Sequence, residues 1–144
     1  MNNKDSPWTA IVVDDSEDIV ELFSEFLEIK GVKVLAKGYN GKDAHELYKK
    51  FKPDVVFLDI MMPQYDGFYA LKKIREEEPH AKIMMVTADL RAETAEKLEG
   101  LDSIALVYKP FDFDKIMQTL DKLMKSNNVD SMAFQGSTIT YFKK

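Results

Sequence analysis

Carboxylate, hydroxyl and ammonium side chains follow four short apolar runs of this sequence. Asp14 and Asp15 follow the run 9–13, Asp59 follows 55–58, Thr87 follows 83–86 and Lys109 follows 104–108. Carboxylates held close together repel one another unless a cation lies between them, and Mg²⁺ suits a few carboxylates, waters and a phosphate, whereas Ca²⁺ usually takes more oxygen ligands. A lysine and a hydroxyl beside them would stabilise the charge of a transferring phosphoryl group. A carboxylate nucleophile would then form an aspartyl phosphate.

The runs that carry these residues are predicted to be strands separated by helices. Apolar runs predict strands at 9–13, 32–39, 55–58, 83–86 and 104–108, and helical spacing predicts helices at 19–29, 41–51, 68–74, 92–98 and 113–124. Alternating strands and helices imply parallel strands, and nearly continuous apolar strands imply a sheet covered on both faces. We therefore expect a three-layer, doubly wound α/β domain. The carboxyl ends of its strands line one crevice, so the polar residues converge there.

Length and composition limit the other possibilities. The 144 residues leave room for one ordinary domain, which we place at 1–125, and 45% of them are hydrophobic. The formal net charge of −5 argues against direct binding to nucleic acid, and the absence of cysteine excludes disulfides and thiolate metal sites. No apolar run is long enough for a signal peptide or a membrane span. We expect a soluble cytoplasmic protein without a membrane partner.

The last nineteen residues, 126–144, are predicted to be a linker and tail without an independent fold. They are too few to form a winged-helix or helix-turn-helix output domain. The stretch 137–142 has the β-branched and aromatic content of a strand. The sequence leaves three alternatives open for this tail: disorder, addition to the sheet, or docking on a partner.

Four motifs, each at a strand end, resemble the response-regulator receiver family, in its stand-alone, chemotaxis-type form. They are Asp14-Asp15, the stretch DIMMPQYDG at 59–67, Thr87-Ala88 and Lys109-Pro110-Phe111. The resemblance covers residues 8–125, and the four motifs in this order are highly specific. It implies a flavodoxin-like (βα)5 fold whose parallel five-stranded sheet has the order 2-1-3-4-5.

The resemblance also implies a metal site and a phosphoacceptor. Asp59 matches the phosphoacceptor and a ligand of Mg²⁺. Asp15 matches the direct metal ligand beside it, Asp14 reaches the metal largely through water, and the backbone carbonyl of Met61 matches the third protein ligand.

The remaining motif residues match groups that hold the phosphoryl group or shape the loops. Thr87 matches the hydroxyl that turns toward the phosphoryl group, and Lys109 the lysine that contacts a phosphoryl oxygen, with a cis bond to Pro110. Gly67 matches the residue that lets the loop after the third strand fold back. One position departs from the family, because Leu106 stands where many receivers have a switch aromatic. Tyr108 lies on the same strand face and is the candidate replacement.

The implied function is a two-component signalling switch that catalyses only its own phosphorylation and dephosphorylation. A histidine kinase or phosphotransfer protein would supply the phosphoryl group. The signal would leave by protein contact through the face built from residues 91–124, in a monomer or a phosphorylation-dependent dimer.

Three alternatives have specific requirements. A Mg²⁺-dependent phosphohydrolase of the haloacid dehalogenase type would need a second acid two residues after the nucleophile, where this chain has Met61, and a cap region. Flavin binding would need a phosphate-binding loop rich in Ser, Thr and Gly after the first strand, where the sequence reads DDSE at 14–17. A degenerate receiver that works without phosphate remains open because of Leu106.

Overall fold

The chain folds as strands that alternate with helices in the order predicted. The computed structural model describes residues 7–88, 92–98, 100–110, 112–125, 132–135 and 138–141. The elements are β1 (Thr9–Val13), α1 (Glu17–Ile29), β2 (Lys33–Gly38), α2 (Gly41–Phe51), β3 (Val55–Asp59), α3 (Gly67–Glu77), β4 (Ile83–Thr87), α4 (Ala92–Leu98), β5 (Ile104–Tyr108), α5 (Phe113–Lys125), β6 (Met132–Gln135) and β7 (Thr138–Tyr141). Among these described helices, none has the length and apolar character that crossing a membrane requires.

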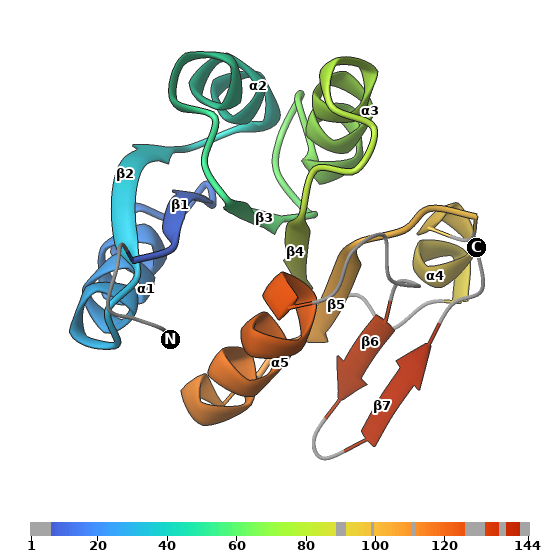
Figure 1. The fold of residues 1–144 in the computed structure, drawn as a ribbon. Helices are drawn as coiled ribbons and strands as arrows, with labels where there is room; N and C mark the ends of the chain where they lie inside the picture. The colour runs from blue at the N-terminus through green and yellow to red at the C-terminus, as the bar shows by residue number, and fades with distance from the viewer. Residues whose placement is uncertain are drawn as a thin grey trace.

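One sheet runs through the molecule, with helices on both of its faces. Its strand order is β2-β1-β3-β4-β5-β6-β7, and β1 to β5 are parallel, which confirms the predicted order 2-1-3-4-5 for the first five strands. Helices α2 and α3 cover one face, and α1 and α5 cover the other (Figure 1). The three-layer α/β architecture is therefore confirmed.

Residues alternate along each central strand between two separate cores, as a pleated strand requires. Leu58 and Leu106 belong to the cluster that includes residues of α2, α3 and α4. Phe57 and Val107 belong to the cluster that includes residues of α1 and α5. Strands β3 and β4 are buried along their whole length, because both of their faces are covered. This double burial explains the continuous apolar runs of the sequence.

Polar caps begin the three helices that follow β1, β2 and the loop after β3. Ser16 accepts a hydrogen bond from the backbone N–H of Ile19 at 3.3 Å. Asn40 and Asp66 begin α2 and α3 in the same way. Each cap satisfies a backbone N–H that the first helical turn leaves unpaired, so it fixes where the preceding loop ends.

The tail adds to the sheet, which is one of the three alternatives that the sequence left open. β6 pairs with β5 in parallel, with Ala105 opposite Met132, and β7 pairs with β6 antiparallel. The predicted linker at 126–128 lies outside the described residues. Helix α5 is thus the crossover between two adjacent parallel strands, β5 and β6, as in the βα units before it.

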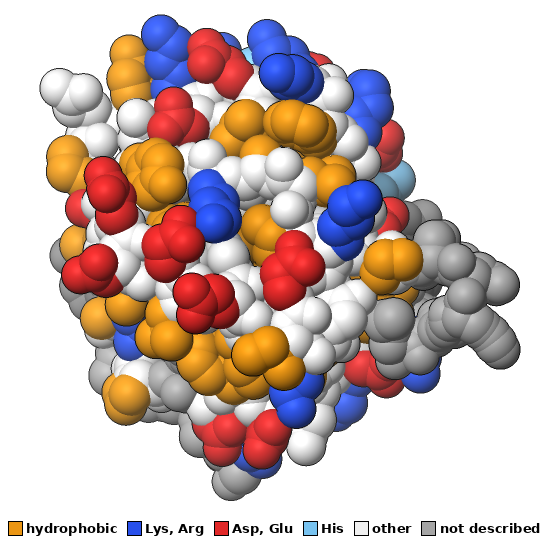
Figure 2. Space-filling model, turned by 90° about the vertical axis from the view of Figure 1, so that its left-hand side faces the viewer, with side chains coloured by type: hydrophobic (Ala, Val, Ile, Leu, Met, Phe, Trp, Pro, Cys, Tyr) orange, Lys and Arg blue, Asp and Glu red, His pale blue; other side chains and the backbone are white. Residues whose placement is uncertain are grey.

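The opposite edge of the sheet is β2, which carries exposed lysines. Lys33 and Lys37 are exposed, and the Lys37 Nζ lies 2.9 Å from a carboxylate oxygen of Glu21 on α1. Figure 2 looks onto the side of the molecule where α1, β2 and α2 lie, and shows acidic and basic side chains between apolar ones. Lysines on an edge strand oppose its pairing with another chain.

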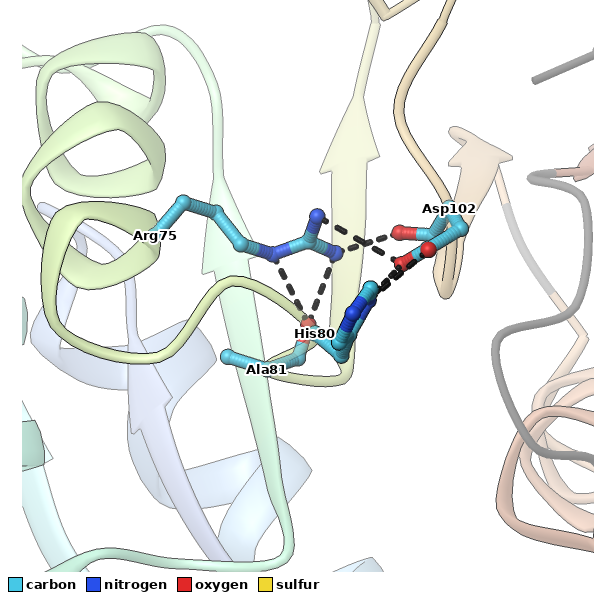
Figure 3. A network of polar contacts seen from close by, with 4 residues as sticks. All are labelled: Arg75, His80, Ala81 and Asp102. Atoms are coloured by element: carbon cyan, nitrogen blue, oxygen red, sulfur yellow. Dashed lines mark hydrogen bonds and ion pairs between the residues drawn. The ribbon is translucent and has the colours of Figure 1, made fainter.

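A largely buried arginine, Arg75, joins the end of α3 to the loops before β4 and β5 (Figure 3). The Arg75 Nε and Nη2 donate to the Ala81 carbonyl at 3.1 and 2.8 Å, and Nη2 also donates to the Asp102 carbonyl. The Asp102 carboxylate lies 3.7 Å from Arg75 Nη1 and 2.8 Å from His80 Nδ1. These contacts lie at the amino-terminal ends of β4 and β5.

Candidate functional site

Three aspartates from two strand ends meet at the carboxyl edge of the sheet. Asp59 is the last residue of β3, and Asp14 and Asp15 directly follow β1, its neighbour in the sheet. One carboxylate oxygen of each lies within 4.8 Å of those of the other two. Asp14 and Asp59 are buried and Asp15 is exposed. The predicted convergence of these side chains is therefore confirmed as geometry.

Asp14 also has a local structural role. One of its oxygens accepts a hydrogen bond from the backbone N–H of Ser16 at 2.9 Å, while Ser16 itself caps α1. Burial raises the pKa of the Asp14 carboxyl above its ordinary value, and the Ser16 N–H partly offsets this rise. The other Asp14 oxygen, Oδ2, lies 3.6 Å from the Lys109 Nζ. Asp14 thus binds the backbone of the residue that caps α1 with one oxygen, while its other oxygen faces the ammonium of Lys109.

Asp59 carries the largest electrostatic penalty of the cluster. Its burial, followed by the charge of Asp14, raises the pKa of the carboxyl to about 6, against the opposing effects of Lys109 and of a hydrogen bond from the Met61 backbone N–H. A low-dielectric surrounding and a neighbouring carboxylate both disfavour the ionised form. A cation bound between these oxygens would remove both causes.

Lys109 lies where it contacts both buried carboxylates. Its Nζ is 3.8 Å from Asp59 Oδ1 as well as 3.6 Å from Asp14 Oδ2. Its backbone N–H donates to the Thr87 carbonyl at 2.7 Å, and the bond to Pro110 is cis, as the family resemblance implied. The lysine side chain is 30% exposed, so it is fixed at its base and accessible at the rim of the site.

Thr87 ends β4 with a fully buried side chain. It is paired with Tyr108 across β4 and β5, and the residue before it, Val86, is paired with Asp59 across β3 and β4. The hydroxyl-bearing residue is thus one position beyond the partner of Asp59 on the adjacent strand. Leu106 and Tyr108 both pack on the core that includes residues of α3 and α4, which confirms that they share a strand face.

Two glycines hold the loop between β3 and α3 against the site. A Cβ on Gly67 would lie 2.6 Å from the Asp59 carbonyl oxygen, so close approach requires glycine here. Gly41, at the start of α2, donates its backbone N–H to the Tyr65 carbonyl at 2.6 Å, and a Cβ there would lie 2.4 Å from the Asp66 carbonyl. Sequence reasoning identified Gly67 but missed Gly41, for which a glycine directly after the Asn40 cap was the available signal.

Met61 points its side chain outward, with 55% of it exposed. Only its backbone carbonyl was predicted as a metal ligand, and that role stays a prediction. Phe111, in the motif after β5, and Arg91, at the start of the predicted output face, lie outside the described residues.

These distances and charges define what the site can do. Three carboxylates and one ammonium form an oxygen-rich cluster with an excess of negative charge, at an edge reached from solvent through Asp15 and Lys109. Such a donor set suits a hard divalent cation of the size of Mg²⁺. A cation and a lysine side by side suit an anionic phosphoryl group.

Comparison with known proteins agrees with this geometry. The family model of the response regulator receiver domain matches residues 10–121. The chemotaxis protein CheY of Thermotoga maritima is 32% identical over 117 residues, which cover 80% of this chain and 96% of that protein. The crystal structure of the CheX–CheY–BeF3–Mg²⁺ complex from Borrelia burgdorferi contains a chain that superposes with a TM-score of 0.72 at 26% identity, covering 82% of this chain and 90% of that one.

A longer relative matches over nearly the whole chain. The probable C4-dicarboxylate response regulator DctR of Priestia megaterium is 29% identical over 148 residues, which are 94% of this chain but only 64% of that protein. The chain therefore spans less than two thirds of that relative. Receiver domains of two-component response regulators are switches that are phosphorylated on an aspartate with Mg²⁺. On its sequence and its fold, this chain belongs to the response regulator receiver domain family.

Proposed function

We propose that Asp59 is the phosphoacceptor of this receiver and that Asp14, Asp15, Asp59 and the Met61 carbonyl hold Mg²⁺. The observation that carries this proposal is the approach of three carboxylates to within 4.8 Å, with the Lys109 ammonium 3.6 and 3.8 Å from two of them. The raised pKa of Asp59 supports it, because a site that disfavours its own charge gains most from a cation. Bound Mg²⁺ would supply positive charge to the carboxylates and to the phosphoryl oxygens.

Asp59, Lys109 and Thr87 then have different roles in phosphoryl transfer. A carboxylate oxygen of Asp59 attacks the phosphorus of a phosphohistidine, so that a P–O bond forms as the P–N bond breaks and the imidazole leaves. The Lys109 ammonium donates to a phosphoryl oxygen, and the Thr87 hydroxyl donates to another. Burial of Asp59 limits the access of water to the acyl phosphate.

We further propose that the chain acts only on itself, as a cytoplasmic phosphoacceptor switch. A histidine kinase or phosphotransfer protein supplies the phosphoryl group, and a target protein contacts the face of α4, β5 and α5. Residues 1–125 form the receiver, and 126–144 have no fold of their own. The described strands of the tail support the absence of an independent fold, because β6 and β7 are four residues each and an isolated two-stranded hairpin is marginally stable.

Labelling with a small phosphodonor tests the phosphoacceptor. Acetyl phosphate with Mg²⁺ should add one phosphoryl group to the wild type, detected by intact-protein mass spectrometry, and none to Asp59→Asn or in EDTA. Asp121→Asn, which removes an exposed carboxylate on α5, is the matched control and should label normally.

Two results would contradict the proposal. Label that persists in Asp59→Asn would place the acceptor elsewhere. Multiple turnover on p-nitrophenyl phosphate would favour the phosphohydrolase alternative instead.

A further inference from the structure

The outer edge of β5 differs in character from the other edge of the five-stranded receiver sheet. β2 reads KVLAKG and carries two exposed lysines, whereas β5 reads IALVY and carries no charge. An uncharged, apolar edge strand is a template for pairing with other chains unless something covers it. In this structure β6 covers it. The composition of β5 is therefore that of a strand made to be paired on both sides.

The pairing between β6 and β5 is short in the described part of the chain. Among the residues that the structure describes, β6 pairs with β5 through Ala105–Val107, whereas β4 pairs with the whole of β5. One side chain of the hairpin is described, that of Met132, and it is 2% exposed within the core cluster that includes residues of α1 and α5. Short elements with few paired residues open at lower free energy than the central strands.

The paired segment of β5 ends close to the phosphorylation site. Val107, opposite Phe134 of β6, is two residues before Lys109. Lys109 contacts Asp14 and Asp59 through its side chain and Thr87 through its backbone. Lys109 directly follows β5, and its backbone N–H joins it to Thr87 at the end of β4, so the site and the β5–β6 pairing are adjacent along the chain.

We propose that the outer edge of β5 is a strand-docking surface, occupied by the chain's own β6–β7 hairpin at rest and opened to a target when Asp59 is phosphorylated. The inference rests on the proposed function. The fitting partner is an extended protein segment that pairs in parallel with Ala105–Val107. An apolar side chain of that segment takes the place of Met132.

Hydrogen exchange of the full chain tests the first part of the proposal, that the β6–β7 hairpin opens when Asp59 is phosphorylated. With Mg²⁺ and beryllofluoride, an acyl-phosphate mimic, amides of 132–141 should exchange about tenfold faster, while those of β1 and β3 keep their protection. Unchanged exchange in the hairpin, together with new protection around Asp59, would overturn this inference and leave the proposed function intact. If hydrogen exchange around Asp59 did not change with Mg²⁺ and beryllofluoride, the proposed function would be overturned and the inference with it.

Substitution of the buried methionine tests the coupling. Met132→Ser should favour the open hairpin without phosphorylation. Because linkage is reciprocal, it should also raise the affinity for beryllofluoride by about the factor by which beryllofluoride favours opening. Met124→Ser is the matched control, since Met124 is partly buried on α5 against the same core but lies outside the hairpin. Equal beryllofluoride affinity in Met132→Ser and the control would contradict the coupling.

A synthetic peptide of residues 132–141, labelled with fluorescein, tests the docking surface itself. It should bind the beryllofluoride-loaded wild type, and unloaded Met132→Ser, about tenfold more tightly than the resting wild type. Equal binding to all three, or none, would overturn the strand-docking surface.

Discussion

Without a bound metal ion, the folded protein disfavours the ionised form of Asp59. Its folded-state pKa of about 6 lies above the ordinary value of 3.8, so between these pH values the folded state binds a proton that the unfolded chain has lost. This group's contribution to the free energy of unfolding therefore falls as pH rises from about 4 to 6. Above that range the penalty is complete and amounts to about 3 kcal/mol.

We expect Asp59→Asn to be more stable than the wild type by about 3 kcal/mol at pH 7.5 in EDTA, because the amide removes this buried charge. Urea unfolding measures the difference, which should shrink toward zero near pH 4. Asp121→Asn should change stability by less than about 0.5 kcal/mol, since Asp121 is paired with Lys125 on the surface. An Asn variant no more stable than the wild type at pH 7.5 would show that burial imposes no such penalty.

Gly67 illustrates a different constraint, that of space beside the acceptor. In Gly67→Ala the new methyl group would meet the Asp59 carbonyl, so we expect a loss of about 1–3 kcal/mol and slower labelling of Asp59 by acetyl phosphate.

Gly100→Ala provides the comparison for Gly67. Gly100 has a φ of +86° with open space around it, so alanine there should be destabilising by about 1 kcal/mol through backbone strain alone. Its labelling rate should match that of the wild type. Equal labelling rates in the two variants would contradict the steric account of Gly67.

At the scale of helices and strands, the stability of the contact between the end of α3 and the loops before β4 and β5 depends on Arg75. Burial lowers the pKa of its guanidinium and Asp102 opposes this, and the same group binds two backbone carbonyls. We expect Arg75→Met to lose about 2–4 kcal/mol, because the buried Asp102 carboxylate loses its cation and both carbonyls lose a donor.

The matched control is Lys72→Met on the same helix, where the side chain is exposed and a change within about 0.5 kcal/mol is expected. Urea unfolding compares the two. Labelling of Asp59 should be unaffected in both, since these residues lie far from the carboxyl edge of the sheet. If Arg75→Met proved as stable as Lys72→Met, the contacts of Arg75 with Ala81 and Asp102 would not contribute to the free energy of unfolding.

The elements also show how far the sequence determines the structure. The five strands and the acidic cluster were predictable because apolar runs of the sequence are followed directly by polar residues, and the topology of a parallel sheet brings such strand ends together. The Arg75–Asp102 contact was not, because the two residues are 27 positions apart and neither lies in a motif. The hairpin was only an open alternative, since 137–142 reads as a strand but nothing local specifies that it pairs with β6, or that β6 pairs with β5.

At the scale of the whole molecule, Mg²⁺ should stabilise the fold in a pH-dependent way. An ion that binds only the native state adds RT ln(1 + [L]/Kd), about 2.7 kcal/mol at one hundred times Kd. Because Asp14 and Asp59 have raised pKa values, binding must displace protons at low pH. The stability gained from the ion should therefore grow from pH 5 to pH 7, whereas the intrinsic contribution of Asp59 falls only up to about pH 6.

Urea unfolding with saturating Mg²⁺ and with EDTA, at pH 5, 6 and 7, measures this gain directly. In Asp15→Asn the gain should be largely lost at every pH, because an exposed ligand is removed while the buried pair is kept. Lys122→Gln, on the exposed side of α5, should keep it in full. A gain that is the same at pH 5 and pH 7 would mean that the ion binds away from Asp59, whose carboxyl has a pKa of about 6 and must lose its proton to bind the ion.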